Sequence, residues 1–399
     1  AGILTPDEKD LPVDPLATGP AKPCPSCGGS SFIPESDVMD TWATSSLSPQ
    51  IVSRWPDDPA LYEQVYPFSC RPQAHEIIRT WAFYTIVKSL YQFDSVPWGH
   101  AVISGWGLAP AGMTKLSKSR GAGGTGPLAM IASYSADAVR YWAASTGLGK
   151  DAVINEERIQ AGGKLVTKLW NVARFSGRFL ENYDPRLNGV TFNPADRWIL
   201  ARAHMVIGRC TDLWRSYDYA TAKSEVEVFF WRDLADNYLE MVKKRFYDDV
   251  AAAGARFALY QSLLATIKLL APILPHVTER IYQGLFATED GSDSIHLASW
   301  PEVNAQWVDD AALDLGETLL AVATAVRRFK SEQNLALGAE LAELHLATAD
   351  PVRAAGLRAA EMDLQSVTRA GTIRVADKLQ PSLTRLGSAG GLELALRIG

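Results

Sequence analysis

Apolar residues recur at helical spacing through most of the chain that follows residue 161. One stripe joins Leu165, Leu169, Val172 and Phe175, with basic residues between them, which predicts an amphipathic helix. Phe230, Leu234, Tyr238 and Val242 form a second stripe at helical spacing, and residues 161–302 are predicted to form an all-helical domain. The other predicted helices cover 194–217, 222–246, 255–270 and the segment that begins at His276.

The pattern differs on either side of that helical domain. Trp98 to Gly105 is typical of a buried strand that ends at glycine, and 136–144 is typical of a helix, so residues 37–160 are predicted to be α/β. Residues 303–399 hold one amphipathic helix, 319–330, and two strand candidates, which predicts a small α+β domain. The strand candidates are 341–346 and 372–375. Residues 1–36 are rich in proline and are predicted to be an extended lead-in.

The composition is that of an ordinary globular chain. Among its 399 residues 47% are hydrophobic and 21% are charged, and the formal net charge is −6. This charge argues against binding nucleic acid by bulk electrostatics, although it leaves shaped recognition open. No apolar run approaches the ~20 residues that cross a bilayer, so no membrane partner is expected. Four cysteines in so long a chain do not make a disulfide framework, and we expect a cytoplasmic protein.

Two of those cysteines, Cys24 and Cys27, form a C-x-x-C-G knuckle. This spacing supplies two thiolates as a zinc ribbon does, but a closed structural zinc site needs four ligands. The sequence contains no second C-x-x-C. Two interpretations stay open: zinc bound by this chain, or half a site that is completed by sequence upstream of it.

A short basic loop, Lys115 to Ser119, precedes the glycine-rich segment 121–126. Lys115 and Lys118, with the hydroxyls of Ser117 and Ser119, put cations and donors where the charge of a polyphosphate could be neutralised. Taken alone, such a string is also typical of a solvated basic turn. The strand that ends before it and the helix that follows it favour the phosphate-binding interpretation.

The loop resembles the K-M-S-K-S signature of class I aminoacyl-tRNA synthetases, with Leu116 in place of the methionine. Leucine and methionine are close in volume, so the departure is mild. The resemblance implies the C-terminal half of a Rossmann-like catalytic domain that uses ATP with Mg²⁺. It implies that Lys115 and Lys118 stabilise the pyrophosphate leaving group, and that Ser117, Ser119 and Gly105 also bind ATP. Such a displacement at phosphorus depends on positioning and charge neutralisation.

Two further strings resemble the valyl branch of this family. They are D-V-M-D-T-W, which ends at Trp42, and H-E-I-I-R-T-W, which ends at Trp81. The resemblance implies that the two tryptophans form walls of a pocket for valine, with Asp40 and Glu76 among the polar groups that face the adenylate. Aromatic walls suit a branched aliphatic side chain, because burial of its methyl groups is the only selectivity it offers. Ordinary core packing of both tryptophans is the alternative.

The predicted helices resemble the anticodon-binding bundle of valyl-tRNA synthetases in the order of their strings. These strings include F-F-W-R-D-L-A-D-N-Y-L-E and L-A-P-I-L-P-H-V-T-E. The resemblance implies tRNA(Val) as a partner, with basic side chains of the bundle as contacts. Three of them end a predicted helix, where the helix dipole also favours cations, so a helix-end role stays open. The candidates are Lys164, Lys168, Arg174, Lys243, Lys244 and Arg245.

Two parts of such an enzyme are missing from the sequence. None of the six histidines lies in an H-I-G-H-like string, and no editing domain is inserted. We expect both upstream of residue 1, in an N-terminal half. One hypothesis is therefore the C-terminal portion of a ligase that acts on valine, ATP and tRNA(Val) as a monomer, but only with that half. The other is a catalytically inactive paralogue that serves as an RNA-binding or regulatory protein. The joint presence of both loop lysines and both tryptophans favours the first.

Overall fold

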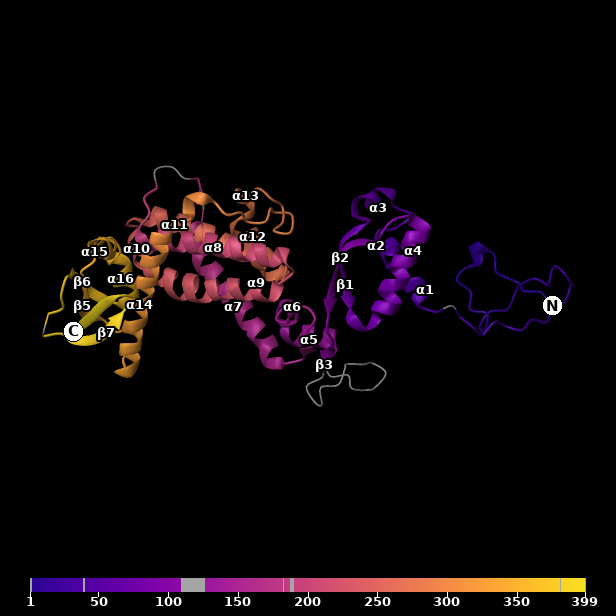
Figure 1. The fold of residues 1–399 in the computed structure, drawn as a ribbon, viewed down its shortest axis with the longest axis horizontal. Helices are drawn as coiled ribbons and strands as arrows, with labels where there is room; N and C mark the ends of the chain where they lie inside the picture. Colours follow the sequence, from indigo (N-terminus) through magenta and orange to yellow (C-terminus); the bar gives the residue numbers. More distant parts are fainter. Residues whose placement is uncertain are drawn as a thin grey trace. The chain divides into compact units, whose positions relative to one another are not determined.

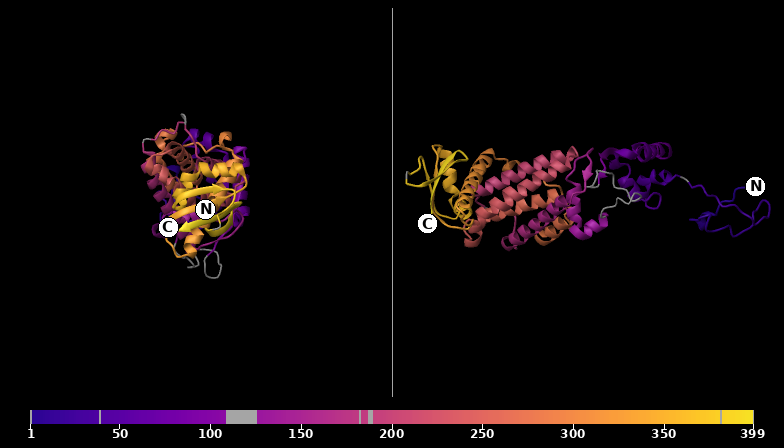
Figure 2. Two further views of the ribbon diagram at one scale, coloured as in Figure 1. Left: turned by 90° about the vertical axis from the view of Figure 1, so that its left-hand side faces the viewer. Right: turned by 90° about the horizontal axis from the view of Figure 1, so that it is seen from below.

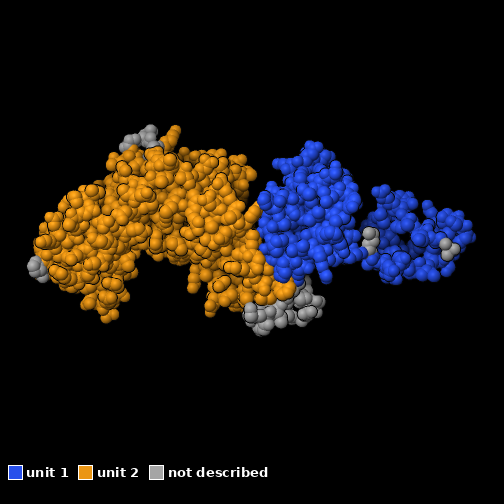
Figure 3. Space-filling model, viewed as in Figure 1, with its two compact units in different colours: residues 1–104 blue, residues 105–399 orange. Residues whose placement is uncertain are grey.

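The computed structural model describes residues 2–38, 40–108, 126–181, 183–186, 190–380 and 382–398. The chain divides into two compact units, Ala1–Ser104 and Gly105–Gly399, which are coloured separately in Figure 3. This division at residue 104 differs from the boundary near 160 that the sequence predicts. The predicted boundary lies inside one continuous helix, α7 (Glu156–Leu180).

Unit 1 begins with the extended lead-in, which contains one short 3-10 helix, η1 (Glu8–Asp10). Its folded part is built on two parallel strands, β1 and β2, whose register runs from Phe68 opposite Trp98 to Ala74 opposite Ser104. Strand β2 confirms the strand predicted up to Gly105, but the prediction that it is buried is wrong, because none of its residues is buried. The elements are α1 (Trp42–Ser45), α2 (Ser48–Val52), α3 (Pro59–Val65), β1 (Phe68–Ala74), η2 (His75–Ile77), π-helix η3 (Ile78–Ala82), α4 (Phe83–Phe93) and β2 (Trp98–Ser104).

Unit 2 opens with a short segment that packs onto the helical bundle. Asp137, at the start of α6, is buried and accepts hydrogen bonds from the backbone N–H groups of His276 (3.3 Å) and Val277 (2.8 Å). It thereby caps α12, where the first N–H groups lack partners within the helix. Arg140 donates to the carbonyl of Pro272 at 2.7 Å. These contacts explain why the segment belongs to the bundle. Its elements are β3 (Gly107–Leu108), α5 (Pro127–Tyr134), α6 (Ala136–Ala143) and β4 (Ala152–Val153).

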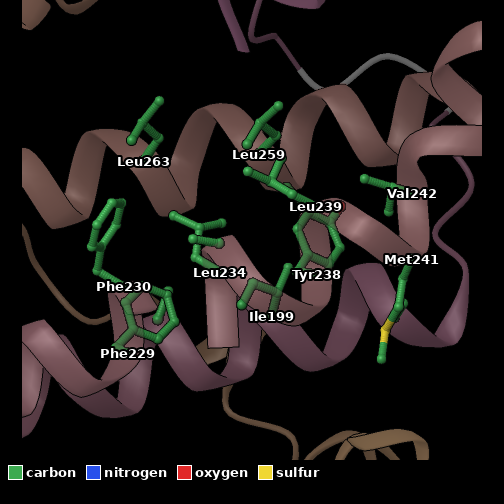
Figure 4. Close-up of a cluster of buried hydrophobic side chains, with 14 of the residues drawn as sticks. Ile199, Phe229, Phe230, Leu234, Tyr238, Leu239, Met241, Val242, Leu259 and Leu263 are labelled. Atoms are coloured by element: carbon green, nitrogen blue, oxygen red, sulfur yellow. The ribbon is translucent and has the colours of Figure 1, made fainter. Parts of the chain in front are cut away.

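The bundle confirms the helices predicted between 161 and 302. The predicted stripe residues Phe230, Leu234, Tyr238 and Val242 are all fully buried, and Figure 4 shows them between helices with Leu259 and Leu263 of α11. The middle of the third predicted helix is a π-helix, η5. The bundle elements (Figure 1) are α7 (Glu156–Leu180), α8 (Pro194–Arg215), α9 (Tyr219–Val228), η5 (Phe229–Tyr238), α10 (Leu239–Asp248), α11 (Ala252–Leu270), α12 (Pro275–Leu285) and α13 (Ala287–Asp290).

The C-terminal part of unit 2 is the predicted small α+β module. Its four strands lie in the order β6-β5-β8-β7, with β5 and β6 parallel and the other pairs antiparallel. In the left view of Figure 2 the yellow strands lie in front of the helices of this unit. Strands β7 and β8 were not predicted. The elements are η6 (Ala305–Trp307), α14 (Asp310–Glu332), β5 (Leu341–Ala347), α15 (Pro351–Ala359), α16 (Glu361–Thr368), β6 (Ala370–Ala376), β7 (Thr384–Ala389) and β8 (Leu392–Ile398).

A buried ionic cluster joins this module to the bundle. Arg245 of α10 donates to Asp196 of α8 at 2.6 Å and to Asp363 of α16 at 2.8 Å, and neither the arginine nor Asp196 has any exposed surface. Tyr238 also donates to Asp196, at 2.8 Å. Burial, reinforced by Asp196, raises the pKa of Asp363 to about 7 although Arg245 opposes the shift. One guanidinium therefore bridges three helices.

The approach of α14 to α8 depends on a glycine. A Cβ atom at Gly316 would lie 1.9 Å from Cδ1 of Trp198, which is far inside contact distance. Trp198 itself has no exposed surface. Only a residue without a side chain fits against the indole at this crossing.

Candidate functional site

The basic loop predicted to bind ATP, with Lys115, Ser117, Lys118 and Ser119, lies outside the described residues. Gly105, its predicted neighbour in the site, is described. A Cβ atom there would lie 2.4 Å from the backbone of Lys150 and 2.6 Å from Oδ1 of Asp151. Asp151 also accepts a hydrogen bond from the N–H of Trp106 at 2.8 Å. Close backbone packing thus explains the glycine, and its contact with ATP stays a prediction.

The two tryptophans predicted to line an amino acid pocket come from elements that pack together in unit 1. Trp42 begins α1, which packs against η3, the helix that carries Trp81. The indole N–H of Trp81 lies 2.7 Å from the carbonyl of Ser45 and 3.0 Å from the hydroxyl of Ser48. Both tryptophans are half-buried, so each retains a surface that a ligand could contact.

The acidic residues of the predicted pocket are both exposed. Asp40 accepts a hydrogen bond from the backbone N–H of Trp42 at 3.0 Å, and it therefore helps to start α1. Glu76 lies in η2, just past the carboxyl end of β1. Next to it, Nδ1 of His75 lies 3.1 Å from the carbonyl oxygen of Ser104, at the end of β2. Polar groups thus gather where the two parallel strands end, which is where ligands bind in open α/β sheets.

The cysteine knuckle, Cys24 to Gly29, forms a turn closed by its own backbone hydrogen bonds. The N–H of Cys24 donates to the carbonyl of Gly29 at 2.9 Å, and the N–H of Gly28 donates back to Cys24 at 2.8 Å. Hydrogen bonds from the backbone of Ser26 and then Cys27 lower the pKa of the Cys24 thiol. Across the described residues, no group of three or more potential metal ligands is found. Two thiolates do not close a tetrahedral zinc site, so the residues present do not fit a structural zinc ion by themselves.

The candidate tRNA contacts on α7 differ in their surroundings. Lys164 and Arg174 are exposed. Lys168 is partly buried, forms a 3.1 Å ion pair with Asp236, and lies 5.0 Å from the ring centre of Trp231. Lys164 and Arg174 are thus available for phosphate contacts, whereas Lys168 would first have to leave its carboxylate.

The three candidates at the end of α10 do not form one basic surface. Lys243 pairs with Glu240, and Lys244 donates to Oε1 of Gln365 at 3.2 Å. Arg245 is fully buried between Asp196 and Asp363, so its prediction as an RNA contact is wrong. A run of cations along a helix turns successive side chains through about 100° each, so one of them can point into the core.

Two hollows beside η5 were missed by the sequence interpretation. One, of about 310 Å³, is lined by Ser224, Glu227, Val228, Trp231 and Arg232. The other, of about 360 Å³, lies between η5, α14 and the end of β7 and includes Arg232, Asn237, Glu317 and Arg328. Arg232 lies in both. The W-R pair in the F-F-W-R-D string was the available signal, because a large aromatic next to an arginine at a helix surface often marks a binding site.

In the part of the chain that the structure describes, we find no helix that is both long and apolar enough to span a membrane.

Two protein-family models match parts of the chain. Residues 23–155 match the model of tRNA synthetases class I (I, L, M and V), and residues 196–346 match the model of the anticodon-binding domain of tRNA ligase. The two matches make the chain similar to class I tRNA synthetases, with part of a catalytic domain followed by an anticodon-binding domain.

Within this class the chain is similar to valine–tRNA ligases along nearly its whole length. It is 39% identical to the enzyme of Methanopyrus kandleri over 96% of this chain, and 36% identical to that of Thermococcus kodakarensis over 95%. In both comparisons it spans only 42% of the relative and corresponds to a C-terminal portion of it. The resemblance to the valyl branch is thereby confirmed.

A solved structure supports the fold. The LeuRS–tRNA–LeuAMS ternary complex from Agrobacterium radiobacter matches 72% of this chain with a TM-score of 0.55 and 20% sequence identity, over 35% of that chain. At this identity the match speaks for the architecture alone.

Proposed function

We propose that this chain is the C-terminal portion of a valine–tRNA ligase. Joined to an N-terminal portion, it would activate valine with ATP and transfer it to tRNA(Val) in the cytoplasm. The observation that carries this proposal is the 39% identity to a valine–tRNA ligase over 96% of the chain. No comparison supports the alternative of a catalytically inactive paralogue. By itself the chain is expected to be inactive, because the first class I signature is not in its sequence.

In this proposal the loop residues act on ATP. With Mg²⁺ bound to its phosphates, ATP would present the α-phosphorus to the carboxylate of valine. Lys115 and Lys118 would neutralise the departing pyrophosphate, with Ser117 and Ser119 donating to its oxygens. Preorganised cations are effective here because charge develops on the leaving group in the transition state.

The valine pocket of the proposal lies in unit 1. Trp42 and Trp81 are half-buried on packed elements, which supports their role as apolar walls. Asp40 and Glu76 are exposed, lie a few residues before the tryptophans in the sequence, and would face polar groups of the adenylate. A pocket of this kind rejects larger side chains well, but it discriminates poorly against an isosteric hydroxyl.

The tRNA contacts of the proposal lie on the bundle. Lys164 and Arg174 are exposed on α7, and Trp231 and Arg232 line a hollow beside η5. An aromatic ring beside cations can stack on an unpaired base while the cations bind its phosphates. The match of residues 196–346 to an anticodon-binding domain supports this assignment for η5.

Reassembly tests the proposed function. The chain is mixed with the part of the Methanopyrus kandleri enzyme that precedes its matched region, and valine-dependent ATP–pyrophosphate exchange is measured. We expect exchange from the mixture and none from either part alone. The same mixture with leucine in place of valine is the control for the pocket. A mixture that binds tRNA but never exchanges pyrophosphate would favour the inactive paralogue.

Binding of tRNA(Val) should depend on the exposed cations of α7. Replacing both Lys164 and Arg174 with glutamine is expected to weaken binding about 10-fold, and to reduce the slope of log K against log salt by about 1 for each lost phosphate contact. Filter binding at several salt concentrations measures both. The control is Arg215→Gln, which removes an exposed cation from the end of α8. Equal salt slopes for wild type and the double variant would exclude these residues from the interface.

A further inference from the structure

Arg71, in the middle of β1, is a buried cation for which the described residues of unit 1 supply no anion. Only 6% of the residue is exposed, and its guanidinium carbon lies 3.6 Å from the ring centre of Trp81 and 5.0 Å from that of Trp98. Atoms Nε and Nη2 are buried and have no hydrogen-bond partner in the described structure. Burial lowers the pKa of Arg71. A buried, unpaired guanidinium is strongly unfavourable, so a partner is to be expected.

The partner is not a described side chain of unit 1. The residues that the structure leaves undescribed include no aspartate and no glutamate, so every acidic side chain of the sequence is described. None of those in unit 1 bonds to Nε or Nη2 of Arg71. The missing group is therefore to be sought outside unit 1.

The two unpartnered atoms indicate which group is missing. Nε–H and Nη2–H project side by side in the guanidinium plane, and a carboxylate can accept from both at once. Arg245 in the same protein shows this pairing: its Nε lies 2.8 Å from one oxygen of Asp363 and its Nη2 lies 3.4 Å from the other. In Arg71 the tryptophans occupy the space over the guanidinium, so the in-plane N–H groups are the ones left to bind.

The surroundings of Arg71 favour a polypeptide over a small anion. Of the buried side-chain atoms without a hydrogen-bond partner in the described residues, most lie in unit 1, on Gln50, Tyr66, Arg71, Gln73 and Ser89. Among the described residues β1 pairs only with β2, so its other edge is open. Parallel sheets are normally covered on both faces and rarely stop at two strands. Large apolar side chains are also exposed in this unit, including Val52, Phe83 and Tyr91.

We propose that Arg71 receives a carboxylate from an aspartate or glutamate on a strand that pairs with the open edge of β1, supplied by the N-terminal portion of the synthetase. This inference rests on the proposed function, because that portion is the partner. It is consistent with the length of the relatives, of which the chain spans 42%. The tryptophans would hold the guanidinium in place before the partner arrives, so little side-chain freedom is lost on docking.

Arg71→Leu tests the proposal through two effects of opposite sign. In the isolated chain the substitution should leave the thermal midpoint of unfolding unchanged or raise it, because an unpaired buried cation is removed. The substitution should also raise the dissociation constant for the N-terminal portion of the Methanopyrus kandleri relative about 100-fold, because the incoming carboxylate is left unpaired. Calorimetry measures this association. A purely structural role between the tryptophans would instead lower the midpoint and leave the affinity of the folded chain unchanged.

Three controls define the outcome. Arg54→Leu removes the same charge from an exposed site in unit 1 and should change the affinity less than 3-fold, as surface charges do. Replacing each acidic residue of the N-terminal portion by its amide should identify one variant whose loss is not additive with Arg71→Leu. Stabilisation of the isolated wild type, but not of Arg71→Leu, by inorganic phosphate would indicate a small-anion site and overturn the proposal.

The result also separates this inference from the proposed function. If the two portions associate and exchange pyrophosphate equally well with and without Arg71, only the carboxylate pairing is wrong. If wild type does not associate at all, the reassembly and the pairing both fail.

Discussion

Arg245→Leu is expected to lower the free energy of unfolding by about 3–5 kcal/mol, the range for removing one partner of a buried ion pair. The arginine has no exposed surface and donates to both Asp196 and Asp363. Its loss would leave two carboxylates buried near each other without a cation. Chemical denaturation followed by circular dichroism measures the change.

Two further variants separate the ionic effect from a packing defect. Arg215→Leu breaks an exposed pair with Asp212 and should change stability by less than about 0.5 kcal/mol. Adding Asp363→Leu to Arg245→Leu should recover part of the loss, because one of the stranded carboxylates is removed. If Arg245→Leu were as stable as Arg215→Leu, the cluster would not hold α16 against the bundle.

Lys118→Ala, in the enzyme reassembled with an N-terminal portion, is expected to slow adenylate formation by about 10²-fold or more. The lysine is proposed to stabilise charge that develops on the pyrophosphate, and removal of one preorganised donor has an effect of this size. Single-turnover formation of valyl-adenylate measures it without interference from tRNA.

The matched control for Lys118 is Lys378→Ala, which removes an exposed lysine from the turn after β6. It should leave the single-turnover rate unchanged. An unaltered rate for Lys118→Ala would remove the loop from the chemistry, while its ATP affinity, measured separately, would show whether it still binds the nucleotide.

The helices of the bundle could be predicted because the apolar residues of each helix recur at helical spacing within a short stretch of sequence. Phe230, Leu234, Tyr238 and Val242 recur every fourth residue and all are fully buried. The π-helical turns of η5 were not foreseen, because a shift of backbone hydrogen bonds leaves this spacing nearly intact.

The strands were harder to predict. Strand β5 carries a dense apolar run and was predicted, whereas β7 contains Leu386 as its one large apolar side chain and includes Gly387. In strand β8, Leu392, Leu394 and Leu396 alternate with other residues, which is the period-2 pattern of a half-buried strand. Short strands depend on their neighbours more than helices do, so their sequences carry less information.

The prediction of site residues was wrong where contacts with residues distant in the sequence determine whether a side chain is buried. Lys244 and Arg245 are adjacent in the sequence, yet one lies at the surface of the bundle and the other is buried on Asp363, 118 residues away. Arg71 was not singled out, because a lone arginine in a strand carries no signal until its two tryptophans and its empty N–H groups are seen together. Family resemblance did identify the class of protein, because it draws on many positions at once.

The contact between Gly316 and Trp198 couples the side chains that these two positions can hold together. The indole lies where the first carbon of any side chain at 316 would be. A methyl group there would overlap the indole and push α14, with the sheet packed on it, away from α8. A side chain at position 316 therefore requires a smaller residue at position 198.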